Sequence, residues 1–186
     1  LYNFYSTSTK AGLSSIRKNA AMIKKVYVPK YLYTLSSILY NYIIFLISLL
    51  VLVAVGVVLG VKPTIYLLQA PLALLLVLML ATGCSFILAT LGVFFRDMEY
   101  LWSVALMLIM YMCAIFYKPE RLLSSGFFWI LKFNPLYCII SIFRDAVFGQ
   151  MMNMHYFLYA LGFSVVTIVV GLVCFIKKQD EFILQI

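Results

Sequence analysis

Four long runs without any Asp, Glu, Lys or Arg dominate the pattern along the chain. The charged residues are confined to the segments before, between and after these runs. The runs cover residues 31–61, 63–95, 100–117 and 146–176. A helix needs about 20 mostly apolar residues to cross a hydrocarbon layer of about 30 Å. The pattern therefore predicts an all-α polytopic membrane protein, organised as a single transmembrane domain over 1–186, with four full spans at residues 34–61, 65–95, 99–117 and 155–176.

The segment 118–150 does not fit a fifth span. Its longest uncharged piece, residues 133–143, is about half the length that a membrane crossing requires. The Asn134–Pro135 dipeptide then separates this piece from the apolar residues 127–131. We therefore expect two short helices that enter one membrane face and return, forming a re-entrant extracellular hairpin over residues 118–150. Backbone at that depth must be shielded by protein or water, so the hairpin should line or cap a cavity.

Composition supports the membrane assignment. Hydrophobic residues make up 66% of the chain and charged residues 11%, whereas a soluble domain has about 45–50% and about 25%. The formal net charge is +8, and a strongly basic chain can indicate nucleic-acid binding. Here the basic residues cluster beside the apolar runs, which is typical of membrane topology and argues against a nucleic-acid partner.

The positions of the basic residues predict the orientation. Lys and Arg are enriched on the cytoplasmic side of membrane proteins. Four spans and one re-entrant hairpin place the segment before the first span, the turn between the second and third spans, and the tail at 177–186 on one side, which should be cytoplasmic. The basic residues on this side are Lys10, Arg17, Lys18, Lys24, Lys25, Lys30, Arg96, Lys177 and Lys178.

The segment 19–30, with the sequence NAAMIKKVYVPK, is basic and half apolar. Ala20, Ile23, Val26 and Tyr27 recur at helical spacing, and Pro29 ends the helix before the first span begins. One interpretation is a membrane anchor, because lysines beside a bilayer attract anionic lipid. The other is a surface helix that receives mechanical force from another protein. From this segment alone the anchor is the simpler interpretation.

Two further stretches are candidate functional sites. Phe95, Arg96 and Asp97 form a tight turn between two spans, either as a solvated turn or as a fixed contact at the inner mouth of a pathway. Asn134 and Pro135 open the second hairpin helix. Arg144 and Asp145 lie near the end of this helix, which either finishes at the headgroups or gates an external exit.

The sequence contains no motif that would supply chemistry or energy. It has no G-x-x-x-x-G-K-[ST] phosphate loop, no metalloprotease or nucleophile-elbow motif, and no pair of carboxylates inside a span. The four cysteines lie in or beside apolar runs without metal-ligand spacing. We therefore expect no enzyme activity, cofactor or metal in this chain, and if the protein moves a cargo, the energy should come from outside it.

Taken together, these stretches resemble the membrane subunit (permease) of type-2 ABC exporters, in particular those that export lipid-linked polysaccharides such as O-antigen, capsule or teichoic acid. The segment NAAMIKKVYVPKYLYTLSSIL is similar to that family's coupling region and the entry to its third span. LGVFFRDMEYLW resembles the turn between its fourth and fifth spans. FNPLYCIISIFRDAVFG resembles its extracellular gate segment, and KKQDEF its cytoplasmic tail. The order and spacing agree over essentially the whole chain.

The resemblance implies a specific architecture. Permeases of this family have six spans preceded by an interfacial helix, so this chain would be truncated at its N-terminus, with residues 1–11 as the end of the second span and 1–30 as that end plus the coupling helix. Two copies would form a homodimer in the bacterial cytoplasmic (inner or plasma) membrane, surrounded by membrane lipids. A separate ABC ATPase subunit would bind the ATP and Mg, and the cargo would be a lipid-linked glycan.

The resemblance also assigns roles to residues. The coupling helix would dock into a cleft of the ATPase subunit, with docking residues in its apolar positions and lysines at the rim. The predicted coupling residues are Asn19, Met22, Ile23, Lys24, Lys25, Val26 and Tyr27. Two alternatives stay open at this point: a type-2 exporter of a drug or another lipid, and a membrane scaffold subunit that transports nothing.

Overall fold

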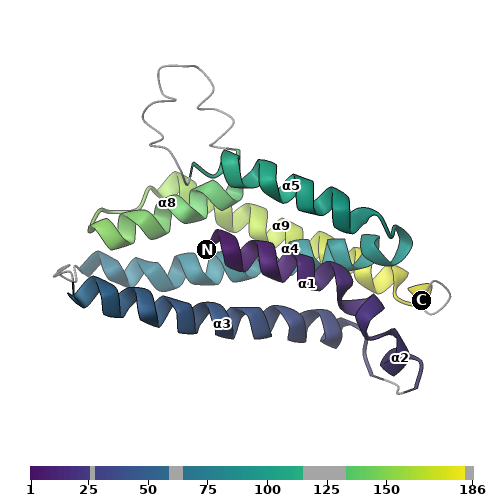
Figure 1. Ribbon diagram of the computed structural model, residues 1–186. Helices are drawn as coiled ribbons and strands as arrows, with labels where there is room; N and C mark the ends of the chain where they lie inside the picture. Colours follow the sequence, from purple (N-terminus) through teal and green to yellow (C-terminus); the bar gives the residue numbers. More distant parts are fainter. Residues whose placement is uncertain (26–27, 59–64, 115–132, 183–186) are drawn as a thin grey trace.

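The computed structural model describes residues 1–25, 28–58, 65–114 and 133–182, and these residues form helices and turns without any strand. Figure 1 shows their order along the chain. The helices are α1 (Tyr2–Lys18), α2 (Ala20–Ile23), α3 (Tyr31–Val58), the 3-10 helix η1 (Ile65–Gln69), α4 (Ala70–Phe94), α5 (Met98–Met112), α8 (Pro135–Phe148) and α9 (Met154–Lys178). The all-α prediction is thus confirmed for the described residues.

Three helical segments in the described residues are long and apolar enough to cross a membrane: Tyr31–Gly56, Ile65–Phe94 and Met154–Lys178. They overlap the predicted spans at 34–61, 65–95 and 155–176. The remaining predicted span, 99–117, is represented by α5, which has 15 residues and is about 22 Å long at the rise of an α-helix. Residues 115–117 and the first part of the hairpin lie outside the described residues, so the span at 99–117 and the re-entrant hairpin stay predictions.

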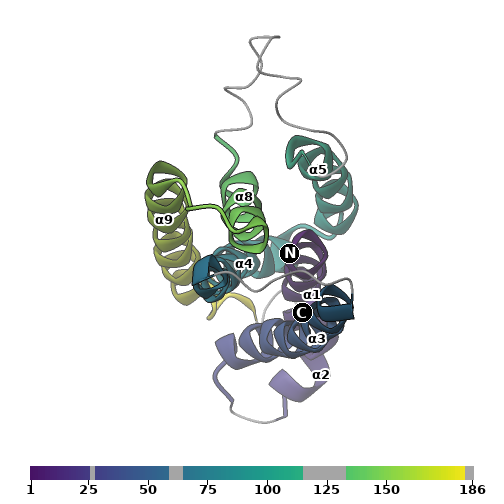
Figure 2. The same ribbon diagram turned by 90° about the vertical axis from the view of Figure 1, so that its left-hand side faces the viewer.

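Helix α4 forms the centre of the bundle. It lies between α9 and α1, with α3 on one side and α8 and α5 on the other (Figure 2). In the most apolar 18-residue stretch of the η1–α4 segment, 56% of the residues are buried inside the protein. In the corresponding stretch of α3, 6% are buried. The apolar surface of α3 is therefore free to contact lipid or another chain, whereas that of α4 forms the core.

Glycines allow α4 to approach its two main neighbours closely. A Cβ atom placed on Gly83 of α4 would lie 2.6 Å from the backbone of Thr167 and Ile168 in α9. On the other side, a Cβ on Gly92 would lie 2.5 Å from the carbonyl oxygen of Leu13 in α1. Small residues at such contacts let membrane helices pack backbone to backbone. Consequently α1, α4 and α9 form one tightly packed unit.

The polar residues of α1 make hydrogen bonds to α3 and to α5. The hydroxyl groups of Ser15 and Thr34 lie 2.8 Å apart and connect α1 to α3. The indole N–H of Trp102 in α5 donates to the Thr9 hydroxyl at 3.0 Å. The Tyr2 hydroxyl donates to the Leu106 carbonyl at 2.7 Å. Because buried polar groups need partners, this serine- and threonine-rich helix is suited to the interior of the bundle.

Candidate coupling and gating sites

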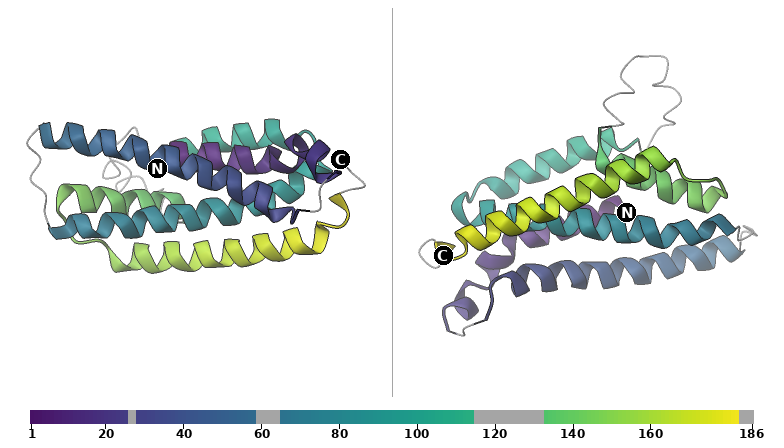
Figure 3. Two further views of the ribbon diagram at one scale, coloured as in Figure 1. Left: turned by 90° about the horizontal axis from the view of Figure 1, so that it is seen from below. Right: turned by 180° about the vertical axis from the view of Figure 1, so that it is seen from behind.

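The segments that the sequence assigns to the cytoplasmic side all meet at one end of the bundle. The C-terminal end of α1, the helix α2, the start of α3, the α4–α5 turn and the C-terminal end of α9 lie there together (Figures 1 and 3). This end, which we call the basic end, carries the predicted cytoplasmic basic residues from Arg17 to Lys30, together with Arg96, Lys177 and Lys178. The structure therefore brings together the three basic segments that the orientation prediction places on one side.

Helix α2 is shorter than the helix predicted over residues 19–27. Asn19 occupies its N-terminal boundary with non-helical φ and ψ of −101° and 12°, and Lys24 follows its last residue. The Asn19 side-chain amide donates to the Ser15 carbonyl at 2.8 Å, which connects α2 to the end of α1. Pro29 disfavours a helical conformation at the residue before it, which limits how far a helix could continue toward α3.

The predicted coupling residues have different environments. Met22 is 55% exposed, and Lys24 and Lys25 are exposed beside it. Ile23 is half-buried and packs against a buried apolar cluster of the bundle. Val26 and Tyr27 lie outside the described residues. An exposed apolar Met22 with neighbouring lysines is suited to docking on a second protein, whereas Ile23 connects α2 to its own bundle.

The turn formed by Phe95, Arg96 and Asp97 is exposed. Phe95 adopts an extended conformation that ends α4, and Asp97 precedes α5 without making a side-chain capping hydrogen bond. Next to the turn, Arg17 of α1 forms an ion pair with Glu99 in the first turn of α5. The turn is therefore exposed, and the Arg17–Glu99 ion pair connects α1 to its α5 side at the basic end.

Helix α8 begins where the sequence predicts, at Asn134 and Pro135, and ends before Gly149. The Asn134 side-chain oxygen accepts a hydrogen bond from the Leu136 backbone N–H at 3.0 Å, and Pro135 is the first helical residue. At the other end Gly149 adopts the left-handed conformation, with φ of 72°. The Gln150 backbone N–H then donates to the Asp145 carbonyl at 2.8 Å. Both ends are stabilised by standard capping interactions.

The predicted gate residues attach α8 to the end of α5. The Arg144 guanidinium donates to the Ala114 carbonyl at 3.4 Å. The Asn134 amide nitrogen lies 3.5 Å from the Cys113 sulfur. Burial raises the pKa of Asp145, and the positive charge of Arg144 partly offsets this shift. Cys113 and Ala114 carry no sequence signal for this role, because a free cysteine in an apolar run usually indicates core packing.

Replacing Asn134 with alanine should destabilise α8. The substitution removes the acceptor for the Leu136 N–H, and the loss of such a cap costs about 1 kcal/mol. The matched variant Asn134→Ser keeps a capping oxygen and should retain most of the stability. Thermal unfolding of the purified permease in detergent would measure both variants, and equal unfolding midpoints for the alanine and serine variants would show that the cap contributes nothing.

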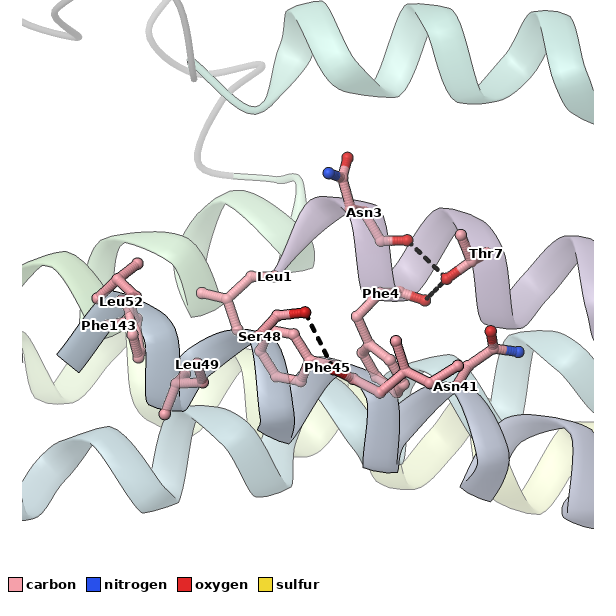
Figure 4. A pocket seen from close by; sticks show the side chains of 11 residues that line it. Leu1, Asn3, Phe4, Thr7, Asn41, Phe45, Ser48, Leu49, Leu52 and Phe143 are labelled. Atoms are coloured by element: carbon pink, nitrogen blue, oxygen red, sulfur yellow. Dashed lines mark hydrogen bonds between the residues drawn. The ribbon is translucent and has the colours of Figure 1, made fainter. Parts of the chain in front are cut away.

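A groove between α1 and α3 has a volume of about 330 Å³ and extends to α8. Figure 4 shows the side chains that line it, with Phe4 stacked on Phe45 at a ring-centroid distance of 5.2 Å. Its polar lining residues are Asn3, Thr7, Asn41 and Ser48. Aromatic faces beside amide and hydroxyl groups can stack on and hydrogen-bond sugar rings. Asn41 and Ser48, single polar residues in a long apolar run, are the only sequence signal for this groove.

The described residues do not contain a group of three His, Cys, Asp or Glu side chains arranged to hold a metal ion. What they contain is a bundle of long uncharged helices, a basic end with an exposed short helix, and a capped helix at the opposite side. This arrangement defines a multi-pass α-helical membrane protein with a basic end.

The chain belongs to the ABC-2 type transporter family, whose family model matches residues 1–148. It is 30% identical over 184 residues to the O-antigen export system permease protein RfbA of Klebsiella pneumoniae, an alignment that covers 97% of this chain and 70% of that protein. A second RfbA protein from the same species is 30% identical over 182 residues. The RfbA protein of Myxococcus xanthus is 26% identical over 148 residues, which cover 79% of this chain and 56% of that protein.

Membership of this family defines what the chain contributes to transport. It is a transmembrane transport subunit, and the ATPase activity resides in a separate subunit. Neither a drug exporter nor a scaffold that transports nothing is favoured by the relatives.

Proposed function

We propose that this chain is the permease subunit of an ATP-driven exporter that moves a lipid-linked O-antigen polysaccharide across the bacterial cytoplasmic membrane. The observation that carries the proposal is the 30% identity over 97% of the chain to a protein named as an O-antigen export permease. Two copies form the pathway, and two separate ATPase subunits drive it. The exposed apolar surfaces of α3 and α5 are available for lipid and for the second copy.

The coupling segment, residues 19–30, receives the movement of the ATPase subunits. Met22 is exposed at the basic end, where an ATPase in the cytoplasm would reach it. Lys24 and Lys25 flank it and attract an acidic rim on the partner or anionic lipid. The anchoring and docking interpretations of this segment are therefore compatible, since lysines can hold the segment at the membrane surface while Met22 faces the ATPase.

The side of the bundle opposite the basic end controls the release of the glycan. Helix α8 is attached to the end of α5 through Arg144 and Asn134. The turn after α8 is attached to η1 through the Met152 N–H, which donates to the Gln69 side chain at 3.1 Å. A displacement of α4 or α5 therefore moves α8. In this proposal α8 is the described part of the extracellular gate, and the groove lined by Phe4, Phe45 and Asn41 belongs to the wall of the glycan path.

Deletion of the gene in a strain that depends on it tests the proposed function. Surface O-antigen should disappear while lipid-linked O-antigen accumulates on the cytoplasmic side, and the unsubstituted gene should restore export. A strain whose ATPase subunit cannot hydrolyse ATP should show the same phenotype. Normal surface O-antigen in the deletion strain, accompanied by sensitivity to a drug, would contradict the polysaccharide assignment and favour a different cargo.

A further inference from the structure

Phe182 is completely buried at the basic end, although it follows the last helix by four residues. Its ring packs edge-on against Phe175 at a centroid distance of 5.2 Å and against Phe94 at 6.1 Å. Phe175 in turn packs edge-on against Phe86 at 5.4 Å. We call these four residues the terminal aromatic cluster. They come from the ends of α4 and α9 and from the turn after α9.

The turn after α9 is built to direct Phe182 back into the bundle. The Glu181 backbone N–H donates to the Lys178 carbonyl at 3.1 Å. The Lys178 ammonium group also binds both oxygens of the Glu181 carboxylate, at 2.8 and 2.9 Å. The same ammonium group lies 5.7 Å from the centroid of the Phe94 ring, within the range of a cation–π contact.

The coupling segment reaches the bundle through the same cluster. Ile23 of α2 and Tyr33 at the start of α3 pack against a buried cluster that contains Phe86, Phe175 and Phe182 together with Ile16, Ala89 and Val93. The Lys30 ammonium group donates a hydrogen bond to the Gln179 carbonyl and lies 6.0 Å from the centroid of the Phe182 ring. By contrast, α2 itself buries none of its residues. Ile23 is a residue of α2 that packs against the buried cluster containing Phe182.

We propose that Phe182 is a positioning residue that transmits movement from the coupling segment to the ends of α4 and α9. The inference rests on the proposed function, in which an ATPase subunit displaces residues 19–30. Close-packed interiors are hardly compressible and transmit strain, so a push on Ile23 or Lys30 moves Phe182 and, through Phe94 and Phe175, the two core helices. The turn after α9 thus takes part in coupling.

The decisive variant is Phe182→Ala, compared with Ile176→Ala as a matched control. Ile176 is 56% exposed at the same end of α9 and lies outside the cluster. Both variants are made in the complete permease with its ATPase partner. Phe182→Ala should keep ATPase association and ATP hydrolysis but export about tenfold less O-antigen per ATP hydrolysed, a change within the range typical of coupling between two sites. An export ratio equal to that of Ile176→Ala would overturn the proposal.

A second readout follows the position of α2 and does not depend on the cargo. A cysteine at Ile23, in a Cys174→Ser background, should react faster with a maleimide when Phe182 is replaced by alanine, because Phe182 belongs to the buried cluster against which Ile23 packs. An unchanged rate would overturn the proposal. Absent O-antigen export by the unsubstituted protein would instead refute the proposed function, and the labelling comparison would still decide the role of Phe182.

If Phe182→Ala does not accumulate in the membrane, the variant Lys30→Met tests the proposal instead. This variant removes the bond to the Gln179 carbonyl and leaves every ring of the cluster in place. We expect a lower export ratio and faster labelling at residue 23, both in the same direction as for Phe182→Ala. Values equal to those of the unsubstituted protein would show that the coupling segment does not act through this end of the chain.

Discussion

Replacing Gly83 with valine is expected to remove most of the folded permease from the membrane. Any Cβ atom at this position would lie 2.6 Å from the backbone of Thr167 and Ile168. A clash with backbone cannot be relieved by rotating a side chain, so α4 and α9 must move apart. Overpacking a core costs typically about 1–3 kcal/mol and occasionally more. Among the described helices, these two form the largest contact. We therefore expect a loss of folding free energy at or above the upper end of that range.

The matched control for this prediction is Gly162→Val. Gly162 lies in α9, one of the same pair of helices, but a Cβ atom there would have nothing within 4 Å. The two variants add the same side chain and the same change in helix propensity. Membrane levels and resistance to thermal aggregation in detergent should fall for Gly83→Val and stay near the unsubstituted values for Gly162→Val. Equal behaviour of the two variants would show that the described approach of α4 and α9 is wrong.

Replacing Met22 with aspartate is expected to release the ATPase subunit from the permease. Central apolar contacts of an interface often contribute 2 kcal/mol or more, and a carboxylate buried without a partner adds a further cost. A loss of that size weakens association by about 30-fold or more. Met22 is exposed on α2, so the folded structure of the permease should be unaffected.

Co-purification of the ATPase subunit with the tagged permease measures this effect, together with export in cells. Met151→Asp is the control, because Met151 is 76% exposed in the turn between α8 and α9, away from the basic end (Figure 1). It should retain the ATPase subunit. If Met22→Asp also retains it and exports normally, then α2 is not the coupling site and the lysines beside it act only as an anchor.

The features that the sequence predicted well are those set by local chemistry. Uncharged runs long enough to cross a bilayer became α3, the η1–α4 segment and α9, since hydrophobic length alone determines such helices. The ends of α8 were also predictable, because Asn134, Pro135 and Gly149 each have a strong positional preference at helix termini.

Features that depend on distant contacts could not be predicted in the same way. The serines and threonines of α1 are unremarkable in sequence, and their placement follows only once Thr34 and Trp102 are brought beside them. Phe182 offered no signal either, since a single phenylalanine after a basic helix end has no periodic pattern. The family resemblance likewise grouped Met22 with Ile23 as docking residues, whereas the structure separates an exposed residue from a packed one.

The most direct test of the account is a photo-crosslink from position 22 in intact cells. A photoreactive amino acid replaces Met22 in the permease, and in a parallel strain it replaces Met151. Irradiation should join the permease to the ATPase subunit from position 22 and should produce no such adduct from position 151. The absence of an ATPase adduct at position 22, with the permease present and exporting, would contradict the claim that α2 receives the force that drives transport.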